Sequence, residues 1–392
     1  MTCSDTLHWP EGLDADRFLA EHWQQKHLWM PAALPGFSTP LSPDELAGLA
    51  LEEGIASRLM TRQSDGSHTL EHGPFETERF AELEGQSFSL LVPDVDKHVP
   101  QLADWLAPFD FLPGWRMDDL MVSYAPDGGS VGAHTDAYDV FLLQASGTRE
   151  WLIDSQTSTM SAEDGGSPVG QLAEFTPNES RVLEPGDLLY LPPGVPHHGI
   201  ARGDNCTTWS IGFRAPSQRQ LVHAIAERLA ETLSDQPLPD PALVRTPNGQ
   251  ISQASLASYR AAWRRAVDLG DTEVDDLLGS VLTAHGDVDD PQNHDADHDQ
   301  DHDPDHDPDH EASLDPDPTG DLYRTPWARL AWTGENDTVT LWANGERLVC
   351  SRALAIALNS RDGVTHKPYS TQDQKVLDRL LAEGIIAGKS GT

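Results

Sequence analysis

Short apolar runs separated by turn residues dominate the middle of the chain, between about residues 119 and 213. Clusters of Gly, Pro and Asp interrupt these strand-sized runs, which favours an antiparallel sheet over alternating strands and helices. Residues 154–180 are polar and Gly-rich and are predicted to form a loop. The predicted barrel strands are Leu120–Tyr124, Asp139–Ala145, Glu150–Ile153, Asp187–Leu191 and Thr207–Phe213, with flanking strands at Leu59–Thr61 and Ser87–Val92.

Helical spacing of apolar residues appears on both sides of this β-rich region. Ser42-Pro43-Asp44-Glu45 combines a capping box with proline at the first helical position, so a helix should start there. Ser217 is a second candidate cap. The predicted helices are Asp14–Trp23, Pro43–Glu53, Asp94–Asp104 as a short helix and connector, Ser217–Leu233, Gln253–Leu269 and Glu273–Leu282.

The end of the chain regains globular character from residue 320 onward. Helices are predicted at Ser351–Leu358 and Thr371–Leu381, and with flanking strands they suggest a winged-helix-like module. Many winged helices bind DNA, but acidic and basic residues balance along the last helix, so it lacks a phosphate-binding stripe. A structural or protein-contact role is the better prediction.

Residues 286–319 form an acidic, low-complexity insert in which histidine recurs every fourth residue from His294 to His310. Pro304 and Pro308 oppose a helix and the density of Asp favours extension, so we predict a disordered linker. The alternative is a weak store for divalent metal, since His and Asp together bind Zn, Ni or Fe. Deleting residues 287–318 is expected to leave catalysis largely intact.

Composition indicates which kinds of binding partner and which cellular compartment to expect. The formal net charge of -38 argues against direct nucleic-acid binding and suits a basic protein partner. The three cysteines show no zinc or disulfide spacing, which fits a reducing cytosol. The N-terminus lacks the features of a secretory signal, and no apolar run is long enough to cross a bilayer. We therefore expect a soluble, cytoplasmic protein.

Candidate metal ligands lie at two places in the β-rich region. His134 and Asp136 are two residues apart, so both side chains leave the same face of an extended segment. Some sixty residues later, Pro-Pro-Gly-Val-Pro-His ends a strand with a tight turn that presents His197. Two histidines and one carboxylate form the facial triad that binds ferrous iron and leaves positions open. His198 points the other way and is assigned to the rim or to support of a ligand.

Four segments together resemble the JmjC-type ribosomal oxygenases, in particular their bacterial YcfD-like branch of ribosomal protein arginine hydroxylases. The segments are Asp118–Tyr124, Gly132–Phe141, Leu183–His197 and Trp209–Pro216. The resemblance implies a mainly β fold with added helices, in which a double-stranded β-helix (cupin/JmjC) barrel precedes a helical dimerisation region and the winged-helix-like module. The implied domains are 1–216 (oxygenase), 217–285 (dimerisation), 286–319 (linker) and 320–392 (C-terminal module). A homodimer follows by analogy.

The same resemblance implies Fe(II) held by His134, Asp136 and His197, with 2-oxoglutarate and O2 as co-substrates. Arg149 follows Ser-Gly-Thr on the next strand, where the family carries the base that holds the distal carboxylate of 2-oxoglutarate, and Arg suits bidentate carboxylate binding. The alternative for Arg149 is an exposed residue paired with Glu150. Ser123 and Ser210 are weaker candidates for a hydroxyl contact to the same carboxylate.

The implied substrate is an arginine of a basic protein, ribosomal protein sixteen of the large subunit. A guanidinium favours carboxylates and an aromatic wall. Candidates near the metal ligands in sequence are Tyr138, Asp118, Asp119 and Asp139, of which Tyr138 is the strongest. Two alternatives stay open: the site hydroxylates His or Asn or demethylates Lys instead, or the protein is a non-catalytic metal-binding cupin.

Overall fold

The computed structural model divides the chain into two compact units, one up to residue 214 and one from residue 217 onward. The acidic insert predicted at 286–319 lies outside the described residues, as does Cys3. The structure describes residues 6–63, 67–156, 171–172, 174–214, 217–238, 250–284, 321–365 and 368–388.

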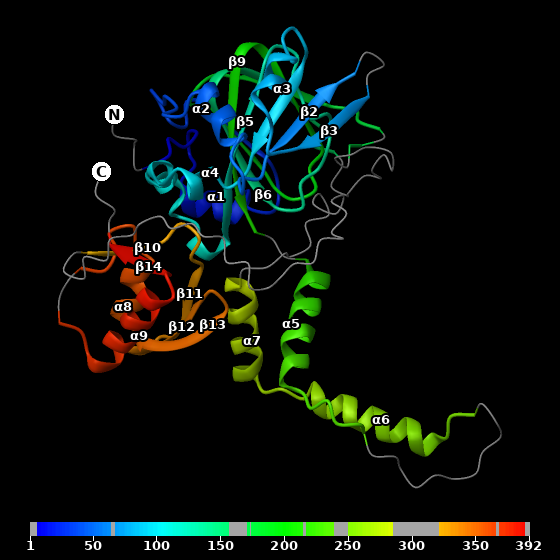
Figure 1. The fold of residues 1–392 in the computed structure, drawn as a ribbon, viewed down its shortest axis with the longest axis vertical. Coiled ribbons are helices and arrows are strands. Elements are labelled where there is room, and N and C mark those ends of the chain that lie inside the picture. Colours follow the sequence, from blue (N-terminus) through cyan, green and yellow to red (C-terminus); the bar gives the residue numbers. More distant parts are fainter. Residues whose placement is uncertain are drawn as a thin grey trace. The chain divides into compact units, whose positions relative to one another are not determined.

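Nine strands form one antiparallel sheet among the described residues of the first unit (Figure 1). The strand order is β1-β8-β6-β9-β5-β4-β2-β3, with β7 paired to β6. The strands are β1 (Leu28–Met30), β2 (Arg58–Arg62), β3 (His68–His72), β4 (Phe88–Val92), β5 (Met117–Ala125), β6 (Asp139–Ile153), β7 (Glu179–Leu183), β8 (Leu188–Leu191) and β9 (His197–Phe213).

Two long, bulged strands give this sheet its shape. The first half of β6 pairs with β8 and the last part of β9, and its second half pairs with β7 and the first part of β9. Between the halves the register shifts around Ser146 and Thr148. Gly147 has a φ of +60°, and a Cβ there would stand 2.7 Å from the carbonyl oxygen of Asn205. Glycine thus permits the bend, and the predicted double-stranded β-helix class is confirmed.

The N-terminal helices cover an aromatic core on one side of this sheet. In α1 (Ala15–Glu21), the fully buried Phe18 meets Tyr190 edge to face, with ring centroids 4.8 Å apart. The helix α2 (Pro43–Leu49) begins at the predicted capping box, where the hydroxyl of Ser42 accepts from the backbone N–H of Glu45. The remaining helices of this unit are α3 (Thr77–Ala81), α4 (Val95–His98), η1 (Pro100–Phe109) and η2 (Gly114–Arg116).

The second unit combines helices with two small sheets (Figure 1). Gly279 of α7 packs directly on the Trp342 ring of β12, where a Cβ would approach within 2.1 Å. The strands are β10 (Leu322–Arg324), β11 (Leu330–Thr333), β12 (Thr338–Ala343), β13 (Glu346–Ser351) and β14 (Ile386–Gly388), and the helices are α5 (Gln218–Thr232), α6 (Gln253–Ala266), α7 (Asp271–Thr283), α8 (Arg352–Leu358) and α9 (Thr371–Ala382).

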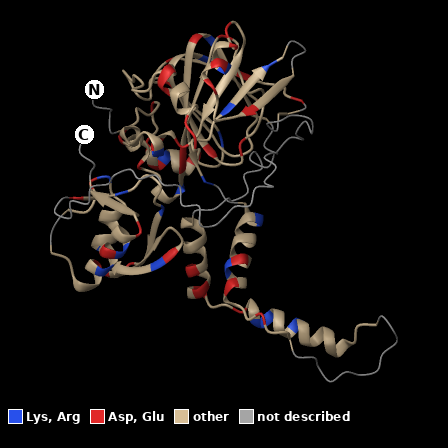
Figure 2. Ribbon diagram, viewed as in Figure 1, with Lys and Arg blue, Asp and Glu red and all other residues tan. Residues whose placement is uncertain are grey.

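Charge is distributed unevenly over the helices of this unit (Figure 2). Over Gln253–Ala266, α6 carries arginines and no acidic residue, whereas α7 carries four acidic residues and no basic one. Across the described part of the chain, every helix is too short or too polar to span a bilayer.

Candidate metal centre

Three side chains that are distant in sequence meet inside the first unit. One nitrogen from each of His134 and His197 and one carboxylate oxygen of Asp136 all lie within 4.8 Å of one another. His134 and Asp136 precede β6, and His197 begins β9. Two backbone hydrogen bonds of 3.0 and 2.9 Å join His134 to His197, and the carbonyl of Asp136 accepts from the N–H of Gly194 at 2.8 Å. Backbone pairing therefore holds both ligand-bearing segments in register.

The donor atoms face one common point. The Nε2 of His134 lies 3.8 Å from one carboxylate oxygen of Asp136, and the Nε2 of His197 lies 3.5 Å from the other. Each Nδ1 lies at hydrogen-bond distance from a backbone carbonyl, that of Gly132 at 3.0 Å and that of Val195 at 2.9 Å. A carbonyl accepts only, so each Nδ1 carries the proton and each Nε2 keeps a lone pair. This set matches the two-histidine, one-carboxylate arrangement that binds ferrous iron.

Burial keeps His197 in its metal-binding form. Its side chain is 2% exposed, and this burial, with His134 alongside, lowers the pKa of His197 to about 4. A neutral imidazole is the form that binds a metal ion.

His198 lies outside the triad and is linked to it by hydrogen bonds. Its Nε2 lies 2.9 Å from the hydroxyl oxygen of Ser130, which also accepts from the N–H of Gly132 at 3.0 Å. The carbonyl of Gly132 in turn accepts from His134. His198 is thus connected to the His134 ring through Ser130 and Gly132.

A cavity opens beside the triad, and alternate residues of β2, β4, β5, β6 and β9 line it. Met121 and Ser123 of β5, Val140 and Leu142 of β6, and Thr208 and Ser210 of β9 face it, as the period of a pleated strand requires. The predicted Ser123 and Ser210 therefore reach the same space as His134 and His197. The Ser123 hydroxyl also lies 3.4 Å from the carbonyl oxygen of Thr208, to which it donates.

Arg149 lines this cavity too and is only 4% exposed. Within the described part of the chain, its buried Nε and Nη2 have no hydrogen-bond acceptor. Glu150, the partner considered from sequence, instead pairs with Arg202 on the neighbouring strand. Two buried guanidinium donors without an acceptor are costly, so they point to an anion that binds from the cavity.

Of the predicted substrate residues, Tyr138 lines this cavity, and Asp119 lies near it beside Gly212. A Cβ placed on Gly212 would stand 3.0 Å from a carboxylate oxygen of Asp119 and 3.6 Å from the ring of Tyr138. Burial, with Asp94 and Asp118 nearby, raises the pKa of Asp119 to about 8. Asp118 lies next to them but forms an ion pair of 2.6 Å with Arg214.

Asp139 does not take the predicted substrate role. It is fully buried, and its two carboxylate oxygens accept from the hydroxyl of Tyr190 at 2.6 Å and from the side-chain amide of Gln24 at 2.8 Å. Its neighbours Tyr138 and Val140 line the cavity, so its own side chain faces the other side of the strand. We assign Asp139 to the core.

Arg58 and Trp151 are among the cavity residues that were not predicted. Arg58 of β2 enters the cavity with an Nη2 3.8 Å from the sulfur of Met121. Trp151 follows Arg149 on the same face of β6. Trp151 is two residues after the predicted Arg149, so in a strand both side chains face the same side. This spacing could have identified Trp151.

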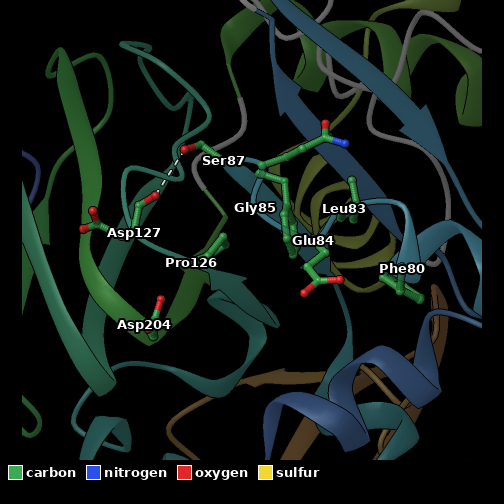
Figure 3. A pocket seen from close by; sticks show the side chains of 10 residues that line it. Phe80, Leu83, Glu84, Gly85, Ser87, Pro126, Asp127 and Asp204 are labelled. Atoms are coloured by element: carbon green, nitrogen blue, oxygen red, sulfur yellow. Dashed lines mark hydrogen bonds between the residues drawn. The ribbon is translucent and has the colours of Figure 1, made fainter.

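A separate hollow lies around the segment between α3 and β4 (Figure 3). Its lining includes Glu84, Asp127 and Asp204 and none of the triad residues. Ser87 donates to the backbone carbonyl of Asp127 at its edge, at 3.1 Å. We assign it no part in the metal centre.

The sequence and the fold both have recognisable relatives. A family model described as a JmjC domain matches residues 104–221. Ribosomal protein uL16 3-hydroxylase of Escherichia coli (strain K12) is 41% identical over 225 residues, which are 57% of this chain and 57% of the relative. A probable ribosomal oxygenase of Haemophilus influenzae is 34% identical over 231 residues, 56% of this chain and 54% of its own. The chain thus aligns with little more than half the length of these relatives.

Solved structures extend the similarity over the whole chain. The X-ray structure of E. coli YcfD matches with a TM-score of 0.75 at 28% identity, covering 98% of this chain and 99% of that one. The structure of YcfD from Escherichia coli in complex with cobalt and 2-oxoglutarate matches with a TM-score of 0.72 at 30% identity and the same coverage. With a JmjC match centred on the His-Asp-His cluster and full-length similarity of fold, the chain belongs to the YcfD-like ribosomal oxygenase family.

Proposed function

We propose that this protein is an Fe(II)- and 2-oxoglutarate-dependent oxygenase that hydroxylates an arginine of ribosomal protein uL16. One observation carries the proposal: a triad of metal-ligand type lines the same cavity as Arg149, whose buried Nε and Nη2 have no acceptor among the described residues. A storage barrel requires only the triad, so the unpaired guanidinium favours an oxygenase over a non-catalytic cupin.

In this proposal His134, Asp136 and His197 hold the iron through the two Nε2 atoms and one carboxylate oxygen. When bound, the iron supplies the activation of O2 that no protein side chain can provide. The hydrogen bonds from each Nδ1 to backbone carbonyls fix the ring orientations before the metal arrives. The chain's task is to present three ligands and leave the remaining positions to co-substrate and oxygen.

Arg149 holds the distal carboxylate of 2-oxoglutarate. Its Nε and Nη2 are buried donors without acceptors, and a carboxylate satisfies such a pair with two parallel hydrogen bonds. Ser123 and Ser210 line the same cavity and are the assigned supporting hydroxyls. Because the surrounding side chains are largely apolar, this ion pair forms away from bulk water, where it is strong.

Tyr138 and Asp119 bind the target guanidinium. The ring of Tyr138 and the carboxylate of Asp119 both lie close to the position that a side chain on Gly212 would occupy. An aromatic face and a carboxylate are the two groups that favour a guanidinium. Asp118 adds negative charge nearby while paired with Arg214. The net charge of -38 favours the approach of a basic ribosomal protein.

The working unit is a homodimer formed through the helical region. Large apolar side chains are exposed along α6, with Trp263 68% exposed and Tyr259 47% exposed. On α5, Val222 is 60% exposed. Exposed aromatic residues of this kind mark interfaces. The basic α6 of one copy also complements the acidic α7 of a second copy, which favours self-association over a foreign partner.

Ribosomal proteins are made and assembled in the cytoplasm, so an enzyme that acts on one works in that compartment. The buried thiols of Cys206 and Cys350 are unpaired, which suits a reducing compartment.

Mass spectrometry of recombinant uL16 after incubation with the protein, Fe(II), ascorbate and 2-oxoglutarate tests the proposal. The expected product carries one added oxygen atom on one arginine, with succinate formed in equal amount. His134→Ala is the matched inactive control, because it removes a metal ligand that is partly exposed. Added oxygen on a histidine or asparagine would replace the arginine assignment, and an unmodified substrate with no succinate would refute the oxygenase.

A further inference from the structure

Trp151 occupies the stretch of cavity wall between the triad and Arg149. Along paired strands, Ile153 lies opposite His197, Trp151 opposite Gly199, and Arg149 opposite Ala201. The Trp151 ring centroid is 5.8 Å from that of His197 and 5.7 Å from the Cζ of Arg149. A molecule that reaches from the triad to Arg149 must therefore pass beside this indole.

The indole N–H of Trp151 is buried and unsatisfied. The residue is 5% exposed, and its Nε1 has no acceptor within the described part of the chain. An indole N–H can only donate, and a buried donor without an acceptor costs stability. Because Trp151 is one of the residues that line the cavity, a ligand bound there is the acceptor that this donor lacks in the ligand-free protein.

The packing of the ring turns the N–H away from strand β9. A Cβ placed on Gly199 would lie 2.6 to 3.0 Å from Cζ3, Cη2 and Cε3 of Trp151. The benzene edge of the indole therefore lies against Gly199. The pyrrole N–H is on the opposite edge from Cε3, so it points away from that strand. Gly199 has to lack a side chain for the ring to take this position.

We propose that Trp151 is a second recognition residue for 2-oxoglutarate and donates its N–H to the distal carboxylate that Arg149 binds. This inference rests on the proposed function and adds a residue to it. One carboxylate has enough lone pairs for the guanidinium and the indole together. The indole also forms an apolar wall along the methylene groups of the co-substrate.

The test compares Trp151→Phe with Trp209→Phe, using the full chain loaded with Mn(II) without O2. Trp209 is a matched control because its indole N–H is also buried and unpaired, but it packs against Phe37 and Trp105 and does not line the cavity. Calorimetric titration with 2-oxoglutarate should give a Kd about tenfold weaker for Trp151→Phe, since a hydrogen bond to a charged group is lost. The Kd of Trp209→Phe should equal that of the wild type. Equal affinity in Trp151→Phe would overturn the proposal.

A second measurement does not depend on the variant folding. In the Zn(II)-loaded wild type, the indole N–H resonance of Trp151 can be identified because replacing Zn(II) by Mn(II) broadens it, given its contact with His197. That resonance should move downfield when 2-oxoglutarate is added. A resonance that stays in place while the co-substrate binds would equally reject the role of Trp151. If the wild type itself fails to bind 2-oxoglutarate, the proposed function fails instead, so the two failures are distinguishable.

Discussion

The substitution Arg149→Met tests whether Arg149 binds a ligand or stabilises the fold. Met has similar length and no charge, so it fills the space without leaving a void. In the ligand-free protein the substitution removes a buried charge whose Nε and Nη2 have no acceptor in the part of the chain that the structure describes. The ligand-free stability should therefore be equal to or higher than that of the wild type, the opposite of what the loss of a structural ion pair produces.

The effect on co-substrate binding should be large. A hydrogen bond to a charged group contributes about 1.5–3 kcal/mol, so the loss of two donors weakens 2-oxoglutarate binding by more than about a hundredfold. In the wild type, ligand at about a hundred times its Kd stabilises the folded state by about 2.7 kcal/mol. For a unit of this size that corresponds to a rise in Tm of about 5–10 °C. The variant should show almost none of this rise.

Thermal unfolding of the Mn(II)-loaded protein, with and without 2-oxoglutarate, measures both quantities. Arg202→Met is the control, since Arg202 pairs with Glu150 at the surface of the neighbouring strand. It should keep the ligand-induced rise in Tm. A variant at Arg149 that keeps this rise, or that is strongly destabilised without ligand, would refute the anion-binding role.

Three further predictions concern the metal, the substrate and the dimer. His134→Ala should abolish succinate formation and weaken metal binding, measured by equilibrium dialysis with Fe(II) or Co(II), whereas full metal affinity would contradict the triad. Because the pKa of Asp119 is raised to about 8, its ionised, guanidinium-binding form increases with pH. The KM for a uL16 peptide should fall by up to about tenfold between pH 7 and 9, and Asp119→Asn should remove this dependence. Trp263→Glu should convert the homodimer to a monomer in sedimentation velocity, and an unchanged sedimentation coefficient would exclude α6 from the interface.

Sequence periodicity predicted most helices because each carries its own signals. The helix begun by Ser42 and Pro43 appears as α2, although it ends at Leu49 rather than Glu53. Short strands at the edge of a sheet were harder to predict from the sequence. The strand β7 (Glu179–Leu183) was not predicted, and its first two residues lie in the region predicted as loop. Its residues are mostly exposed and polar, and they are ordered by pairing with β6.

Long bent strands were also missed for a physical reason. Polar residues and Gly203 interrupt the apolar pattern of β9, so only its last part was predicted, while the structure continues it back to His197. Pairing with β6 over this length compensates for the weak local preference. The length of such strands depends on tertiary pairing, which the local sequence does not reveal.

In the candidate site, sequence spacing identified residues whose side chains share one face of a strand. His134, Asp136 and His197 converge, and Arg149 lines the same cavity. Asp139 was misassigned because it directly follows Tyr138, and neighbouring side chains in an extended strand face opposite sides. The unpaired N–H of Trp151 could not be predicted, since an unsatisfied donor is a property of the packed structure.

A crystal structure of the protein with Mn(II) and 2-oxoglutarate tests the central claim most directly. The anomalous signal of the metal should locate it on Nε2 of His134, Nε2 of His197 and a carboxylate oxygen of Asp136, with the distal carboxylate of 2-oxoglutarate on Arg149. A metal bound elsewhere, or a co-substrate that leaves Arg149 without a partner, would contradict the account.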